Sequence, residues 1–156
     1  RALVTDRLRQ ALTSARRNLH RVALLYIDLD RFKPVNDIYG HAVGDLLLRE
    51  AAERMRLCVR ESDTVGRFGS DEFVVLLPHV ESENDALRVA EKIRHAIGEP
   101  FRLGGLTLDV SASIGIAVYP HHGSDDAGLL LHADSAMYDA KHGGRDQVCV
   151  FGDSAP

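Results

Sequence analysis

Four segments of the chain repeat apolar residues every three or four positions, which is the period of an amphipathic helix. They cover residues 3–19, 44–59, 83–97 and 126–141. In the first segment the arginines lie away from the apolar face, so we expect them to be solvated rather than to bind a ligand. Each segment should place its apolar face against a common core.

Shorter apolar runs between these helices predict β-strands. They lie at residues 21–28, 64–68, 72–77, 111–119 and 146–151. The pair Gly104-Gly105 predicts a tight turn between two further short strands, and Gly115 predicts a bulge or a close backbone approach. The stretch "DRFKPVNDIYGHAVG", with a proline and two glycines, is interpreted as a loop.

The mixed order of strands and helices, with a hairpin at its centre, predicts an α+β fold in which helices pack on one sheet. A chain of 156 residues corresponds to about one domain. Its 45% hydrophobic and 27% charged residues are typical of a soluble globular protein. Because the first residue already lies at the edge of a predicted helix, we expect a piece of a longer protein.

The charge and cysteine content narrow the function classes. A net charge of -4 argues against broad binding to nucleic acid, although it is compatible with a local basic site for a few phosphates. Cys58 and Cys149 lack metal-site spacing, so we expect free thiols in a reducing compartment. No apolar run approaches the roughly 18 residues of a membrane span, and no signal peptide is visible.

Two acidic clusters follow predicted strands. Asp28 and Asp30 lie on one face of the first strand because strand side chains alternate. Asp71 and Glu72 open the second strand of the predicted hairpin, after a two-residue glycine turn that should need positive φ. Carboxylates suit a hard cation such as Mg²⁺, so the clusters predict one metal site. Solvated strand-end acids are the alternative.

Three further groups could bind a ligand. Lys141 and Arg145 flank two glycines, where they could clamp a triphosphate or simply stabilise a helix C-terminus. Four polar side chains in and after the 30–44 segment could read a guanine edge, or act as loop and cap residues. They are Asn36, Asp37, His41 and Asp45.

Arg60 and Asp63 lie just before the hairpin and are three residues apart. Side chains of opposite charge at this spacing can clamp a ligand or pair with each other, and surface charges of this kind are usually solvated. The four histidines in the last quarter of the chain show no metal-ligand spacing, and we interpret them as surface or packing residues. They are His121, His122, His132 and His142.

Taken together, these motifs resemble the GGDEF domains of the diguanylate cyclase family. The resemblance rests on the order and spacing of "DLDRFKPVND", "GHAVGD", "RESD", "RFGSDEF", "SIGIAVYP" and "ADSAMYDAKHGGRD". It implies a central, mostly antiparallel five-stranded sheet with surrounding helices, related to the palm of nucleotide polymerases and cyclases. It also implies that two GTP molecules become cyclic dimeric GMP and two pyrophosphates across an antiparallel pair of domains, with Mg²⁺ or Mn²⁺.

The resemblance assigns roles to individual residues. Asp28, Asp71 and the backbone carbonyl of Leu29 match the metal ligands; Asp71 also matches the general base, and Glu72 supports this site. Residues matching the substrate-binding positions are Phe32, Lys33, Asn36, His41, Asp45, Gly69, Ser70, Lys141 and Arg145.

Within that set, Asn36 and Asp45 match the guanine-reading pair, and Lys141 and Arg145 match the phosphate-binding pair. A second family site binds the product and inhibits the enzyme. Arg60 and Asp63 match this site, and Arg88 or Arg94 would add a further cation.

One position departs from the family signature, because Ser70 replaces its second glycine. A positive φ there would cost serine on the order of 1 kcal/mol. This leaves two hypotheses. The first is an active cyclase with product inhibition; the second is a degenerate domain that binds GTP or cyclic dimeric GMP and regulates an attached domain, such as an EAL phosphodiesterase. Both place the domain in the cytoplasm, in a parent protein that could be membrane-anchored.

Family membership also implies the partners. They are GTP, cyclic dimeric GMP, a second copy of the same domain, and an attached sensor or EAL-type domain. Nucleic acid is not among the expected partners.

Overall fold

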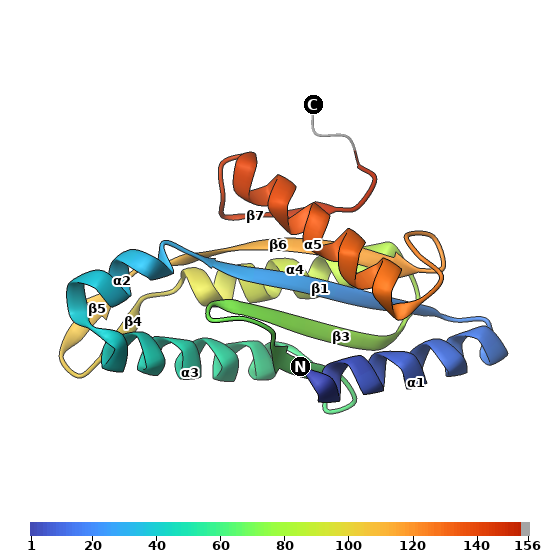
Figure 1. Cartoon of the computed structure of the whole chain (residues 1–156), viewed down its shortest axis with the longest axis horizontal. Helices are drawn as coiled ribbons and strands as arrows, with labels where there is room; N and C mark the ends of the chain where they lie inside the picture. The colour runs from blue at the N-terminus through green and yellow to red at the C-terminus, as the bar shows by residue number, and fades with distance from the viewer. Residues whose placement is uncertain (154–156) are drawn as a thin grey trace.

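The computed structural model describes residues 1–153 and contains a five-stranded sheet in the order β2-β3-β1-β6-β7 (Figure 1). The strands are β1 Arg21–Asp30, β2 Thr64–Arg67, β3 Glu72–Val80, β6 Ser111–Tyr119 and β7 Gln147–Val150. All neighbours pair antiparallel except β6 and β7. The predicted α+β class and the mostly antiparallel sheet are therefore confirmed.

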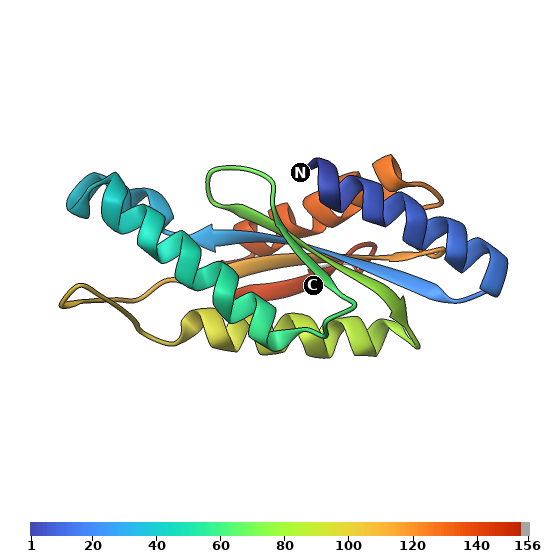
Figure 2. The ribbon, with the colours of Figure 1, turned by 90° about the horizontal axis from the view of Figure 1, so that it is seen from below.

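Helices cover both faces of the sheet, as Figure 2 shows. The helices are α1 Ala2–Asn18, α2 Phe32–Tyr39, α3 His41–Cys58, α4 Glu83–Gly98 and α5 Asp126–His142. Helices α1 and α5 pack on the face that carries Leu24, Tyr26 and Leu76. Helices α2, α3 and α4 pack on the opposite face, which carries Leu25 and Ile27. Strand alternation divides β1 between these two cores.

The stretch interpreted as a loop is mostly helical, so that prediction was wrong. Residues Phe32–Tyr39 form α2, and α3 begins at His41 rather than at residue 44. Pro34 is tolerated because it lies in the first turn of α2, where backbone N–H groups have no helical partner. Gly40, with φ 91°, separates the two helices.

Glycine and proline positions explain three local features. A Cβ on Gly115 would overlap the backbone of α5, so this glycine allows the close approach that its place in a strand predicted. Gly104 and Gly105 have positive φ and join β4 Phe101–Leu103 to β5 Leu106–Leu108, as expected. Pro78 lies beyond the residues of β3 that pair with β2, at an irregularity in the β1–β3 register.

The α1 arginines are exposed, as predicted, and two of them also contact residues at or just before the start of α5. Arg9 pairs with Asp126 at 2.9 Å, and Arg16 donates to the Ser124 carbonyl oxygen at 2.7 Å. These contacts tie α1 to the start of α5. Cys58 and Cys149 are free thiols, as expected. No helix within residues 1–153 is long and apolar enough to cross a membrane.

Candidate functional site

The two acidic clusters meet at one end of the sheet, which we call the acidic end. Asp28, near the end of β1, lies opposite Glu72, at the start of β3. The Leu29 N–H donates to the Asp71 carbonyl oxygen at 3.2 Å and holds the two segments together. The fold therefore brings Asp28, Asp71 and Glu72 side by side.

Asp28 carries the strongest electrostatic signal at this end. Burial, followed by the negative charge of Asp71, raises the pKa of its carboxyl to about 7, although Lys141 opposes the shift. Its Oδ1 atom is buried and has no hydrogen-bond partner among the described residues. A hard divalent cation would occupy such an oxygen and relieve the repulsion between the carboxylates. The side chains present therefore fit a Mg²⁺ or Mn²⁺ ion.

Asp30 differs from Asp28 although both lie on one face of β1. It is fully buried. Burial alone would raise its pKa, but hydrogen bonds from Ser111, Ser113, the Asp146 N–H and Lys141 lower it below its usual range. The expectation that both aspartates belong to one metal site is wrong for Asp30, because its oxygens are already occupied.

Glu72 leans toward the middle of the sheet. The Tyr26 hydroxyl donates to Glu72 Oε1 at 3.4 Å. Burial, Asp134 and Asp71 raise the pKa of Glu72, and burial followed by Glu72 raises the pKa of Tyr26 to about 12. The sequence analysis missed Tyr26 and Asp134. Tyr26 could have been found, because it precedes Asp28 by two residues on the same strand face.

The hairpin turn differs from the one predicted. Four residues separate β2 from β3, and neither Gly69 nor Ser70 has a positive φ. The Arg67 side chain holds the turn by donating to the Gly69 and Ser70 carbonyl oxygens at 3.0 and 2.8 Å. A Cβ on Gly69 would lie 2.7 Å from Glu72 Oε1, so the glycine here provides space rather than an unusual backbone.

Ser70 fits this turn without backbone strain. Its hydroxyl donates to Asp71 Oδ1 at 3.4 Å. The expected cost of about 1 kcal/mol for a positive φ therefore does not arise. Ser70 places a hydroxyl beside the acidic end and leaves both carboxylates of the signature intact.

The basic pair lies at the same end. Lys141, in the last turn of α5, places its Nζ 3.4 Å from Asp28 Oδ2 and 3.2 Å from Asp30 Oδ1. Arg145 follows on the exposed turn between α5 and β7, where its φ is 64°. A phosphate group bound to a cation at Asp28 would meet the positive charge of Lys141, and the phosphate contact predicted for Arg145 stays a prediction.

The predicted guanine-reading residues lie on α2 and α3. Asn36 Oδ1 is buried without a hydrogen-bond partner among residues 1–153, at a cost of about 1–3 kcal/mol for such an atom. A Cβ on Gly44 would overlap this oxygen, so the glycine makes room for the Asn36 amide. Asp45 lines a neighbouring cavity of about 320 Å³ together with Arg49.

Three further residues predicted to bind substrate differ in their exposure. Phe32 is 5% exposed and belongs to the core, where it supports α2 and α3. Lys33 and His41 are exposed. Their predicted substrate contacts stay predictions.

A larger cavity, of about 760 Å³, lies away from the acidic end. Arg60, Asp63, Arg88 and Lys92 are among the residues that line it. Asp63 Oδ2 accepts a hydrogen bond from the Arg60 N–H at 2.8 Å, which holds the turn between α3 and β2. Of the two candidates for an additional cation, Arg88 lines this cavity, where it pairs with Asp85 at 2.9 Å, whereas Arg94 lies outside it and pairs with Glu91 and Asp146.

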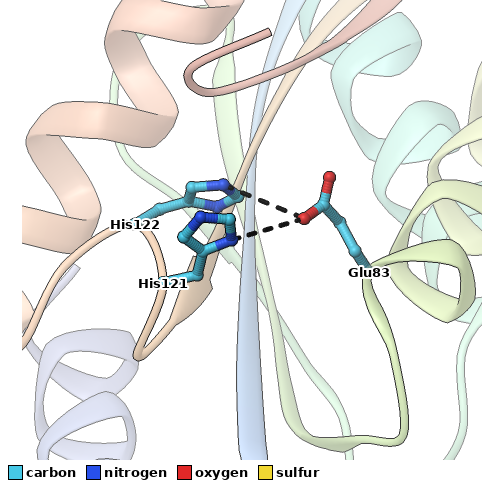
Figure 3. Close-up of side chains that lie close together, drawn as sticks. All are labelled: Glu83, His121 and His122. Carbon is cyan, nitrogen blue, oxygen red and sulfur yellow. Dashed lines mark ion pairs between the residues drawn. The ribbon is translucent and has the colours of Figure 1, made fainter.

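A second group of metal-type side chains lies around the turn after β6, and we call it the histidine cluster (Figure 3). Glu83 Oε2 lies 4.0 Å from His121 Nδ1 and 3.9 Å from His122 Nε2. The Val118 N–H donates to His122 Nδ1 at 2.9 Å, so the neutral ring carries its proton on Nε2. That proton faces Glu83 and occupies the nitrogen a metal would need. In this tautomer His122 therefore offers no free ring nitrogen to a metal.

Comparison with known proteins places this geometry in a family. A family model described as "Diguanylate cyclase, GGDEF domain" matches residues 1–147. The chain belongs to the GGDEF family. The resemblance inferred from the motifs is thereby confirmed.

Individual relatives agree with this assignment. The chain is 49% identical over 151 residues to the bifunctional diguanylate cyclase/cyclic di-GMP phosphodiesterase MucR of Pseudomonas aeruginosa, covering 97% of this chain and 22% of MucR. It is 48% identical to the diguanylate cyclase TpbB of the same organism, covering 93% of this chain and 34% of TpbB. The chain thus spans about a fifth of MucR and about a third of TpbB.

Solved structures share the fold. The crystal structure of the GGDEF domain of TpbB (or YfiN) superposes with a TM-score of 0.96 at 45% identity, covering 99% of this chain and 96% of that one. The GGDEF domain of DgcB from Caulobacter crescentus, solved in complex with c-di-GMP, gives a TM-score of 0.90 at 26% identity, covering 98% of this chain and 88% of that one.

Proposed function

We propose that this GGDEF domain is an active diguanylate cyclase that condenses two GTP molecules into cyclic dimeric GMP and two pyrophosphates. The observation that carries the proposal is the buried, unpartnered Oδ1 of Asp28, set beside Asp71 and Lys141. A divalent cation bound to this oxygen would supply the partner that it lacks. The names of MucR and TpbB support cyclase chemistry for the family.

The residues divide the reaction between them. Asp28, Asp71 and the Leu29 carbonyl would hold Mg²⁺ or Mn²⁺, which neutralises charge on the phosphates. Asp71 accepts the proton of the 3′-hydroxyl as its oxygen bonds to the α-phosphorus of the other GTP, while the bond to the bridging oxygen breaks and pyrophosphate leaves. Lys141 and Arg145 hold the phosphates, and Asn36 and Asp45 read guanine.

Each domain supplies one GTP, so the reaction requires a second copy of the domain facing the first. We also propose that the chain is one GGDEF module of a longer, cytoplasmic or membrane-anchored signalling protein, in which a sensor or EAL-type domain controls the pairing. The relatives support this, because the chain spans only 22% of MucR and 34% of TpbB.

The cavity at Arg60 and Asp63 is proposed to bind cyclic dimeric GMP as an inhibitor. The exposed Arg60 and Arg88 side chains supply positive charge for two phosphates, and the cavity of about 760 Å³ is large enough for a dinucleotide. The c-di-GMP complex of DgcB supports product binding within the family. Arg60→Ala should weaken cyclic dimeric GMP binding while GTP affinity stays unchanged; equal product affinity by calorimetry would remove Arg60 from this role.

The alternative is a degenerate domain that binds nucleotide without turnover. The backbone at Ser70 gives no support to this alternative, because the residue adopts a φ open to any amino acid. The deciding experiment measures GTP turnover with Mg²⁺ on the domain fused at its N-terminus to a dimerising coiled coil. Cyclic dimeric GMP and pyrophosphate should form, and should vanish with Asp71→Ala. A dimer that binds GTP yet forms no product would favour the binding module.

A further inference from the structure

Asp30 is a buried carboxylate whose hydrogen-bonding capacity is fully used. Its Oδ1 accepts from Ser113 Oγ at 2.7 Å and from Lys141 Nζ at 3.2 Å. Its Oδ2 accepts from Ser111 Oγ at 2.7 Å and from the Asp146 N–H at 3.0 Å. A carboxylate offers about four lone-pair sites, so none is left for a cation. Asp28, two residues earlier, has one carboxylate oxygen, Oδ1, without a hydrogen-bond partner among the described residues.

The donors to Asp30 belong to different elements. Two serines come from β6, Lys141 comes from the end of α5, and the Asp146 N–H comes from the turn before β7. Asp30 therefore joins the end of β1 to both segments that carry the proposed phosphate-binding cations. Lys141 cannot turn fully onto Asp28 while it also bonds Asp30.

Backbone strain gathers around the same carboxylate. Arg31, which follows Asp30, has φ 63°, and the consecutive Arg145 and Asp146 have φ 64° and 46°. Left-handed conformations of such residues cost on the order of 1 kcal/mol each and persist only where surrounding contacts impose them. The Asp30–Asp146 hydrogen bond is one such contact.

A second contact holds the same turn from the α4 side. Arg94 NH1 lies 3.0 Å from Asp146 Oδ1, and the Arg94 guanidinium is itself held by Glu91 Oε2 at 2.9 Å. Arg145 directly precedes Asp146, the residue that is held by both Asp30 and Arg94. The turn is thus held from the sheet by Asp30 and from α4 by Arg94.

We propose that Asp30 and Arg94 are positioning residues that hold the Lys141 ammonium and the Arg145 turn ready for the phosphates of GTP. The proposal rests on the cyclase function proposed above and deepens it. Neither Asp30 nor Arg94 is among the residues proposed to bind the metal ion or the guanine base. Their loss should therefore weaken recognition of the triphosphate while metal binding and guanine recognition persist.

The test compares Asp30→Asn with Asp28→Asn in three calorimetric titrations, with Mn²⁺ alone, with GTP and Mn²⁺, and with GMP. Asp30→Asn should weaken GTP binding about tenfold, the scale of one charge-assisted hydrogen bond, and leave the Mn²⁺ and GMP affinities within about twofold. Asp28→Asn should lose Mn²⁺ binding. Loss of Mn²⁺ binding in both variants would make Asp30 a metal ligand, and equal losses for GTP and GMP would exclude phosphate positioning.

Arg94→Gln provides a second route, because this side chain is partly exposed and can be replaced even if Asp30→Asn fails to fold. GTP binding should weaken about threefold, with GMP unchanged. Arg9→Gln is the control, since Arg9 also joins two elements by an ion pair, with Asp126 at 2.9 Å, and belongs to no proposed binding site. Identical GTP affinities in the two arginine variants would overturn the role of Arg94. A wild-type domain that binds no GTP would instead refute the cyclase proposal itself.

Discussion

The acidic end and the histidine cluster both bring together side chains that can bind metals. They differ in whether the oxygen and nitrogen atoms of those side chains still have unused lone pairs. At the acidic end, Asp28 Oδ1 is buried without a hydrogen-bond partner in the described part of the chain, as is Asn36 Oδ1 on α2. At the histidine cluster, His122 accepts the Val118 N–H with one ring nitrogen and carries a proton on the other. Proximity alone would rank the two alike. Unused lone pairs make the acidic end the stronger candidate for a ligand site.

The largest expected effect concerns Asp71 at the acidic end. Asp71→Asn should lower kcat for cyclic dimeric GMP by about 10²–10⁴-fold, the usual contribution of a general base. Stability should not fall, because the substitution removes a negative charge that raises the pKa of Asp28. Product formation on a dimerised domain and thermal unfolding check both parts. Activity within tenfold of wild type would show that another group takes the proton.

The second prediction compares metal binding at the acidic end with metal binding at the histidine cluster. Mn²⁺ at about 100 times its dissociation constant stabilises a folded site by about 2.7 kcal/mol, which should raise the melting temperature by several degrees. Asp28→Asn should abolish this shift, and Glu83→Gln should keep it. The same titration with Zn²⁺ should show no contribution from the histidine cluster. A Zn²⁺ shift that Glu83→Gln removes would contradict the assigned proton on His122.

The third prediction uses the titration of His122. Burial, assisted by His121 and His132, lowers its pKa below the ordinary value of 6.5. The unfolded chain then binds a proton at a higher pH than the folded one. The contribution of His122 to stability is complete above about pH 6.5 and is lost as the pH falls toward the lower folded pKa, by at most about 1.4 kcal/mol per pH unit.

His122→Asn tests this directly, because an amide oxygen can accept the Val118 N–H without titrating. Denaturant unfolding between pH 7 and pH 5 should depend less on pH in this variant. His95→Gln is the control, since His95 is 74% exposed and is not among the groups that shift the pKa of His122, so the pH dependence should be retained. Equal pH slopes for wild type and His122→Asn would show that His122 is not the responsible group.

The sequence predicted the sheet and long helices well, because apolar periodicity reports burial directly. It failed at residues 30–44, where a proline and two glycines suggested a loop while Phe32 and Val35 were already anchoring a short helix. Motif spacing indicated which residues converge, yet it could not separate Asp28 from Asp30. That difference depends on Ser111, Ser113 and Asp146, which lie more than 80 residues away in the sequence.

The smallest expected effect is at Ser70, where the sequence suggested the largest doubt. The turn requires no positive φ, and the hydroxyl contacts only the carboxylate of Asp71, at 3.4 Å. Ser70→Gly should therefore change kcat by less than about threefold, since substitutions without a steric or backbone mechanism stay within roughly 0.5 kcal/mol. Gly69→Ala is the contrasting variant, because its Cβ would press on Glu72 Oε1. A large gain in kcat from Ser70→Gly would contradict this prediction. Because the turn is not strained, such a gain would show that the serine side chain obstructs the incoming nucleotide.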